Sequence, residues 1–161
     1  MIKVLLVDDH PVVRAGYARL LTQQPGIDVV AEAGNADEAY KAYIQHMPDV
    51  TITDVSMPGV GGLGLVQKIL MRHAHACLLV CSMYDSAPLV ERVFQTGAKG
   101  FVSKNAQPQD LIKAVHEVYA GRSFNSETQS HQQYIGQQED EVARLASLTP
   151  KEYELLRLLT Q

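Results

Sequence analysis

The sequence predicts an α/β fold in which a parallel β-sheet carries helices on both faces. Five short apolar runs are spaced between residues 2 and 102: Ile2–Val7, Ile27–Ala33, Val50–Thr53, Cys77–Cys81 and Gly100–Val102. The runs are continuous rather than alternating, which is typical of strands buried on both faces of a parallel sheet. Helix-like segments separate them, and strands that alternate with helices predict right-handed βαβ units.

Helix signals lie in the segments between the runs. Pro11 and Pro108 stand at the expected first turns of the first and last of these helices, where proline is favoured. Asn35 with Glu38 three residues later resembles a capping box at the start of the second helix. Gly121 follows the amphipathic segment QDLIKAVHEVYA and marks its end.

Composition indicates an ordinary globular protein that is not targeted to a membrane. Of 161 residues, 46% are hydrophobic and 20% are charged, and the net charge of −4 argues against a basic nucleic-acid surface. No apolar run approaches the ~20 residues of a membrane helix. The start, MIKVLLVDDH, is too short and too acidic for a signal peptide, so a cytoplasmic protein is expected. Cys77 and Cys81 are interpreted as buried thiols, without a metal or disulfide role.

The residues after Gly121 differ in character. Residues 122–147 are rich in Gln and poor in large apolar side chains, which is typical of a polar linker. Residues 148–161 read LTPKEYELLRLLTQ, with a capping box from Thr149 to Glu152, Pro150 at the first helical position, and four leucines. A lone helix of this length is unstable in water. We therefore expect residues 148–161 to begin a second domain.

Polar side chains follow four of the five predicted strands at the point where each strand ends. Asp8 and Asp9 follow the first, Asp54 the third, Ser82 the fourth and Lys104 the fifth. Ligands bind at the carboxyl ends of the strands in such sheets, so these side chains are expected to converge there. Three packed acids repel one another unless a cation offsets their charge, and oxygen ligands suit Mg²⁺ or Mn²⁺.

The chemistry that this set supports is phosphoryl transfer to a carboxylate. One acid attacks phosphorus and forms an acyl phosphate, a metal offsets the developing charge, and the lysine and the hydroxyl bind phosphoryl oxygens. Taken singly, each residue has an ordinary interpretation: an aspartate in a turn, a serine cap, a solvated lysine. The ordered combination, with one group at each strand end, favours the functional interpretation.

Four segments carry a family resemblance. VLLVDDHPVVRAG, TDVSMPGVGGL, VCSMYD and GAKGFVSKNA resemble the receiver domain of bacterial two-component response regulators, from residue 1 to about residue 121. The DDH opening and the GAKGFVSK ending resemble the NarL/FixJ subgroup, whose members carry a LuxR-type helix-turn-helix domain. LTPKEYELLRLLTQ resembles the beginning of that domain. The resemblance implies a flavodoxin-like fold with five parallel strands in the order 2-1-3-4-5.

The resemblance also implies roles for single residues. Asp54 would accept the phosphoryl group from a phosphohistidine of a sensor histidine kinase. Asp9 would bind Mg²⁺ directly, Asp8 directly or through water, and the backbone carbonyl of Ser56 would be a further ligand.

The remaining roles concern the response to phosphorylation. Ser82 and Lys104 would hold phosphoryl oxygens, and Phe101 would be an aromatic switch residue, with a plain core aromatic as the alternative. Phosphorylation would then control dimerisation and DNA binding by the helix-turn-helix domain of a longer protein, not by these 161 residues alone. No enzymatic activity is expected beyond the protein's own phosphotransfer and autodephosphorylation.

Two other functions remain open. A magnesium-dependent aspartyl-phosphate phosphatase of the haloacid-dehalogenase type would have D-x-D after the first strand, whereas this chain has D-D-H. A phosphorylation-independent interaction module is the second alternative, against which Asp54, Ser82 and Lys104 argue. Gly61 and Gly64 depart from the family pattern, which often has acids there, and they predict a more flexible loop after Asp54.

Overall fold

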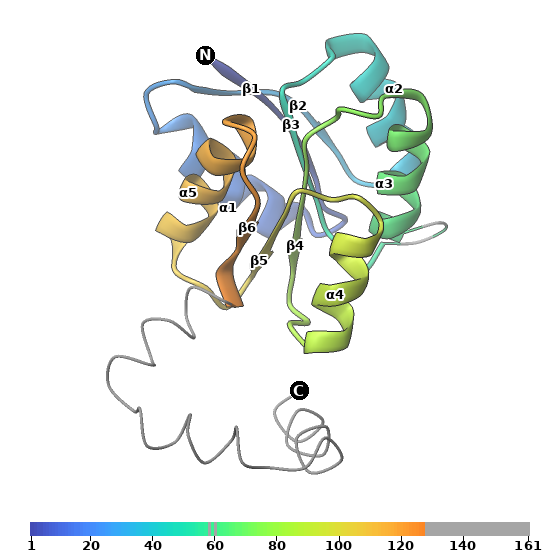
Figure 1. Cartoon of the computed structure of the whole chain (residues 1–161). Helices are drawn as coiled ribbons and strands as arrows, with labels where there is room; N and C mark the ends of the chain where they lie inside the picture. Colours follow the sequence, from blue (N-terminus) through green and yellow to red (C-terminus); the bar gives the residue numbers. More distant parts are fainter. Residues whose placement is uncertain (58, 60, 128–161) are drawn as a thin grey trace, which may run out of the picture.

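A parallel β-sheet runs through the centre of the molecule in the order β2-β1-β3-β4-β5-β6 (Figure 1). The structure, a computed structural model, describes residues 1–57, 59 and 61–127. The strands are β1 (Ile2–Val7), β2 (Ile27–Ala33), β3 (Val50–Thr53), β4 (Leu78–Ser82), β5 (Gly100–Ser103) and β6 (Phe124–Asn125). The helices are α1 (Pro11–Thr22), α2 (Ala36–His46), α3 (Gly61–Arg72), α4 (Ala87–Gln95) and α5 (Pro108–Tyr119).

Helices cover both faces of the sheet, with α1 and α5 on one side and α2, α3 and α4 on the other (Figure 1). Successive residues of a strand point to opposite faces. Leu5 and Phe101 accordingly pack in the core beneath α2, α3 and α4, whereas Leu6 and Val102 pack beneath α1 and α5. Burial on both faces explains why β1 after Lys3, and β5, carry apolar residues at successive positions.

The predicted fold class is confirmed. β1, β2 and β3 begin and end at the predicted residues, and β4 is displaced by one residue at each end. The predicted cap of α2 is present, because the side chain of Asn35 accepts a hydrogen bond from the Glu38 amide at 2.9 Å. Cys81 is buried as expected, whereas Cys77 is only partly buried, and both thiols are free.

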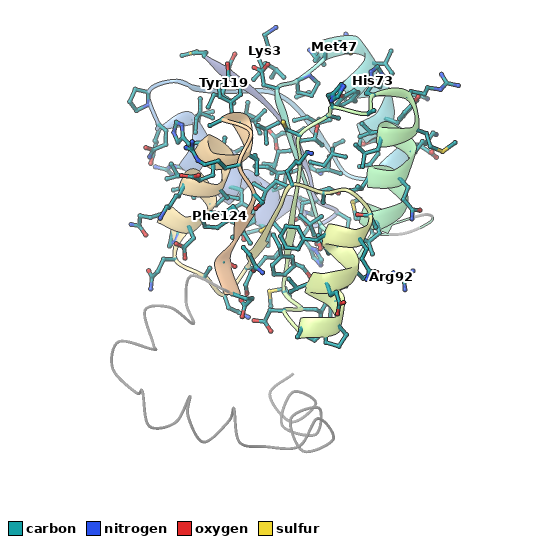
Figure 2. All side chains as sticks on the ribbon, in the orientation of Figure 1. Lys3, Met47, His73, Arg92, Tyr119 and Phe124 are labelled. Carbon is teal, nitrogen blue, oxygen red and sulfur yellow. The ribbon has the colours of Figure 1, made fainter. Side chains whose placement is uncertain are left out.

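A sixth strand extends the sheet beyond the five that were predicted. β6 lies within the stretch 122–147 that the sequence analysis assigned to a polar linker, and it pairs in parallel with β5. Phe124 projects from β6 into the core beneath α5 and is 3% exposed (Figure 2). Gly100 permits this close packing, since a Cβ there would lie 2.7 Å from a methyl carbon of Leu79 and 3.3 Å from the Phe124 carbonyl oxygen.

The described residues include no helix that is long and apolar enough to cross a membrane. The rest of the expected linker, residues 128–147, and the expected helix over residues 148–161 lie outside the described residues.

Candidate functional site

Strand register brings the candidate residues together at the carboxyl edge of the sheet. Val7 of β1 pairs with Thr53 of β3, so the next residues, Asp8 and Asp54, emerge side by side. The Asp54 amide donates to the carbonyl of Val7 at 3.1 Å, which continues the ladder by one step. Two carboxylates that are distant in sequence thus become neighbours through backbone pairing alone.

Lys104 links these two carboxylates. Its Nζ donates to Asp8 Oδ2 and to Asp54 Oδ2, at 2.8 Å each. The three side chains are between 3% and 5% exposed, so the contacts are shielded from water. Burial alone would lower the pKa of Lys104, but the hydrogen bonds and charges of Asp54 and Asp8 outweigh it and raise the pKa above its ordinary value. The amine is therefore held in its cationic form.

The donor set at this edge fits a divalent cation. Asp8, Asp9, His10 and Asp54 each offer a ligand atom, and these atoms all lie within 4.8 Å of one another. Three carboxylates against one ammonium leave an excess of negative charge when the imidazole is neutral. Asp9 Oδ1 is buried and has no hydrogen-bond partner, which is costly for a carboxylate oxygen unless something else binds it. A hard cation satisfies both requirements.

The loop after Asp54 is held close to the carboxylate by backbone contacts. The Ser56 amide donates to Asp54 Oδ1 at 3.1 Å, and the Gly62 amide donates to the carbonyl of Val55 at 3.1 Å. A Cβ at Gly62 would lie 1.8 Å from the carbonyl oxygen of Asp54. Gly62 is therefore a positioning residue that the sequence analysis missed, and only its place in the glycine-rich segment GVGGLGL hinted at it.

Ser82 and Phe101 belong to neighbouring strands, β4 and β5, and among the described residues neither is hydrogen-bonded to the acids. Ser82 is fully buried at the end of β4, and its Oγ accepts a hydrogen bond from the Tyr84 amide at 3.0 Å. The Lys104 amide donates to the Ser82 carbonyl at 2.8 Å, so these two residues are held together through the backbone. Phe101 is fully buried in the core beneath α4, together with Val90 and Val93.

Arg14 and His10 also contribute to the site, although neither was assigned a role from the sequence. Arg14 Nη1 donates to the carbonyl oxygen of Asp8 at 2.9 Å and so supports the turn that carries the acidic pair. His10 Nδ1 lies 3.3 Å from Asp8 Oδ1 and 3.0 Å from Asp9 Oδ1. The available signal for His10 was its position directly after the acidic pair, whereas Arg14 lies in the first turns of α1, which follows that pair.

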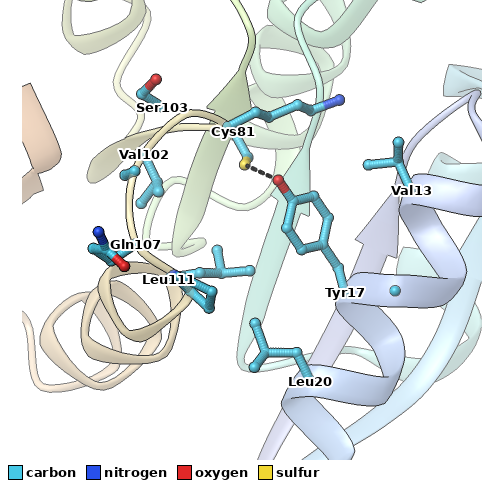
Figure 3. A pocket seen from close by; sticks show the side chains of 12 residues that line it. Val13, Tyr17, Leu20, Cys81, Val102, Ser103, Gln107 and Leu111 are labelled. Atoms are coloured by element: carbon cyan, nitrogen blue, oxygen red, sulfur yellow. Dashed lines mark hydrogen bonds between the residues drawn. The ribbon is translucent and has the colours of Figure 1, made fainter.

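A cavity of about 390 Å³ lies between α1 and α5, beside the acids rather than over them. Leu20 and Leu111 line it from the two helices, and Cys81 donates a weak hydrogen bond to the Tyr17 hydroxyl at 3.7 Å (Figure 3). Burial raises the pKa of the Cys81 thiol to about 12, so it is neutral at ordinary pH and functions as a core residue. Lys104 also lines this cavity, but none of the three aspartates does.

Comparisons with known proteins agree with this arrangement. The family model for the response regulator receiver domain matches residues 4–116. Response regulator UvrY of Escherichia coli K12 is 37% identical over 100% of this chain and 75% of its own length. Oxygen regulatory protein NreC of Staphylococcus epidermidis is 35% identical over 99% of this chain and 77% of its own length.

Solved structures show the same likeness. A LuxR-family two-component response regulator from Aurantimonas sp. SI85-9A1 aligns with a TM-score of 0.76 at 38% identity and covers 78% of this chain and 90% of its own. The signal receiver domain of the putative response regulator NarL from Mycobacterium tuberculosis aligns with a TM-score of 0.70 at 32% identity, over 75% of this chain and 98% of its own. Because the receiver family model matches residues 4–116 and the relatives match most or all of the chain, the chain belongs to the two-component response regulators of the NarL/LuxR group and contains their receiver domain.

Proposed function

We propose that this chain is a phosphorylation-controlled switch and that Asp54 is its phosphoacceptor. The observation that carries the proposal is the Asp54 carboxylate, buried at a strand end beside Asp8 and sharing the Lys104 ammonium with it. The membership of the chain in the receiver family supports the same role. A phosphohistidine of a sensor histidine kinase is the proposed donor.

The transfer would proceed by nucleophilic attack at phosphorus. An Asp54 carboxylate oxygen forms the new bond to phosphorus, and the bond from phosphorus to the donor's imidazole nitrogen breaks, leaving the electron pair on the imidazole. Negative charge accumulates on the equatorial oxygens in such a transition state. The Lys104 ammonium is already hydrogen-bonded to Asp54, so it can donate to a phosphoryl oxygen on Asp54 with little rearrangement.

We assign the metal site to the carboxylates of Asp8, Asp9 and Asp54, with the Ser56 carbonyl as a further ligand. Mg²⁺, or Mn²⁺, would neutralise part of the charge that develops on the phosphoryl group. The buried Asp9 oxygen without a hydrogen bond and the excess of acids over bases in the cluster support this assignment. Ser56 is exposed, and its amide holds Asp54 Oδ1 in place from the same loop.

Ser82 and Phe101 are the proposed elements of the switch. The Ser82 hydroxyl can donate its proton to a phosphoryl oxygen while it still accepts from the Tyr84 amide, because a hydroxyl both donates and accepts. A shift of Ser82 toward the phosphoryl group would change the packing around Phe101 in the core beneath α4. Phosphorylation then biases a two-state surface near α4 and α5.

We infer a transcriptional output for the protein to which this receiver belongs. In this proposal the receiver extends through β6, which pairs with β5, the rest of residues 122–147 is the linker, and residues 148–161 are the first helix of a LuxR-type helix-turn-helix domain. Response regulator UvrY and oxygen regulatory protein NreC are regulatory proteins by name, and both match residues beyond the receiver. Phosphorylation would favour a dimer, and each DNA-binding domain would place one recognition helix in a major groove.

Incubation with acetyl phosphate and MgCl₂, followed by intact mass measurement, tests the phosphoacceptor. We expect the mass of one phosphoryl group to be added, and we expect Asp54→Asn to prevent it. Unchanged mass in the wild type would favour a phosphorylation-independent interaction module. Repeated turnover of phosphomonoesters would instead favour the haloacid-dehalogenase type of phosphatase.

A further inference from the structure

His10 lies against the acidic cluster and does not perform the usual task of its position. It occupies the N-cap of α1, yet its side chain makes no capping hydrogen bond. Its imidazole instead faces the acids: Nδ1 is hydrogen-bonded to Asp8 Oδ1 at 3.3 Å and lies 3.0 Å from Asp9 Oδ1. Its backbone amide donates to Asp8 Oδ1 at 2.9 Å, which ties the residue to the first acid.

We propose that His10 Nδ1 is an additional ligand of the divalent cation and that it shifts the preference of the site from Mg²⁺ toward Mn²⁺. This inference rests on the proposed metal site of Asp8, Asp9 and Asp54. It adds a nitrogen donor to a set that otherwise consists of oxygens.

The spacing of the donor atoms supports coordination of a common ion. Ligands next to one another around an octahedral ion with bonds of about 2.0–2.1 Å are separated by about 3 Å. The separations of Nδ1 from the two carboxylate oxygens, 3.0 and 3.3 Å, match that edge length. Nδ1 is hydrogen-bonded to Asp8 Oδ1, but Asp9 Oδ1 has no hydrogen bond although Nδ1 lies 3.0 Å away, so the lone pairs of that oxygen remain open to a cation.

The chemistry of the donor atom then determines for which metal the affinity of the site increases. Imidazole suits Zn, Cu, Fe and Ni best, and Mn²⁺ stands at the weak end of the same series, whereas Mg²⁺ lies outside it, prefers oxygen ligands and gives up its waters reluctantly. Coordination uses the lone pair of Nδ1, so a bound cation replaces the hydrogen bond between Nδ1 and Asp8 Oδ1, and the ring proton then resides on Nε2. A nitrogen ligand at this position therefore strengthens Mn²⁺ binding more than Mg²⁺ binding.

The competing interpretation is that His10 is only a counter-charge for the acids. In that case the imidazole competes with an incoming cation for Asp8 and Asp9, and its removal leaves the affinities for both metals equal to or higher than before. The two interpretations thus predict opposite effects of the same substitution.

Calorimetric titration of the full 161-residue chain, without a histidine tag, separates them. We expect His10→Ala to weaken Mn²⁺ binding by about tenfold and Mg²⁺ binding by less than about threefold. His75→Ala is the matched control, because His75 is exposed and precedes β4, at the opposite end of the sheet from the acids. Equal losses for the two metals, or no loss, would overturn the inference.

A spectroscopic measurement tests the ligand without relying on a variant's stability. Pulsed electron paramagnetic resonance of the Mn²⁺-loaded wild type should show coupling to a directly bound ¹⁴N nucleus, which His75→Ala retains and His10→Ala loses. Mn²⁺ binding without nitrogen coupling refutes the role of His10 and leaves the carboxylate site intact. If neither metal binds, or if Asp9→Asn leaves binding unchanged, the metal site in the proposed function fails as well.

Discussion

Gly62 shows how a single position controls the geometry of the proposed phosphoacceptor. A Cβ added there would lie 1.8 Å from the carbonyl oxygen of Asp54 and 2.7 Å from its carbonyl carbon, so the backbone has to move. We expect Gly62→Ala to lower the free energy of unfolding by about 1–3 kcal/mol and to slow phosphorylation by acetyl phosphate. Urea denaturation and the rate of mass gain measure the two effects.

Gly16→Ala is the control for this substitution. Gly16 is exposed on α1 and has nothing within 4 Å of the added carbon, so alanine should stabilise the helix by roughly 0.5–1 kcal/mol. If both variants had the same stability and the same phosphorylation rate as the wild type, Gly62 would not be a positioning residue.

The site residues differ in how far they could be predicted. Asp8, Asp54 and Lys104 were placed together from the sequence because the carboxyl ends of parallel strands meet at one edge. Gly62 could not be identified, since its constraint arises from the path of the loop that returns it to the Asp54 backbone. Gly61 and Gly64 were singled out instead, because they stand where the family pattern often has acids.

At the scale of elements, β6 is held partly by one hydrogen bond from β5. The Ser103 amide donates to Ser126 Oγ at 2.9 Å, and both residues are buried. Ser126→Ala would leave this amide without a partner, which costs about 1–3 kcal/mol in a buried position. Urea denaturation should show that loss, whereas Ser123→Ala, on an exposed residue next to β6, should change stability by less than about 0.5 kcal/mol. Equal stability of the two variants would mean that water replaces the lost hydroxyl.

β6 is also the strand that could not be predicted from the sequence. β1 and β3 were predicted to the residue because they are almost wholly buried and therefore apolar, and the edge strand β2 was predicted because its apolar residues outnumber its two exposed acids. β6 pairs through only two residues, and Phe124 is its one buried apolar side chain, so it lacks the run of 4–8 residues that identifies a strand. Its neighbours in the sequence are polar, which favours the prediction of a linker.

For the molecule as a whole, folding gathers the negative charges of Asp8, Asp9 and Asp54 at the carboxyl edge of the sheet. The unfolded chain separates Asp8 and Asp9 from Asp54, so a cation that needs all three binds the native state alone. Such a ligand stabilises by about 2.7 kcal/mol when its concentration is 100 times its dissociation constant. We therefore expect MgCl₂ to raise the melting temperature by several degrees, progressively with concentration, and we expect EDTA to reverse the effect.

General screening by salt has to be separated from binding at this site. NaCl at matched ionic strength reports the screening contribution, which acts on the net charge of −4 wherever the charges lie. Asp9→Asn removes a carboxylate from the cluster and should abolish the Mg²⁺-specific rise. Asp28→Asn removes an equal charge from an exposed position on β2 and should leave the rise intact. Should NaCl reproduce the whole effect, or Asp9→Asn preserve it, Mg²⁺ would be acting on the surface and not through the strand-end carboxylates.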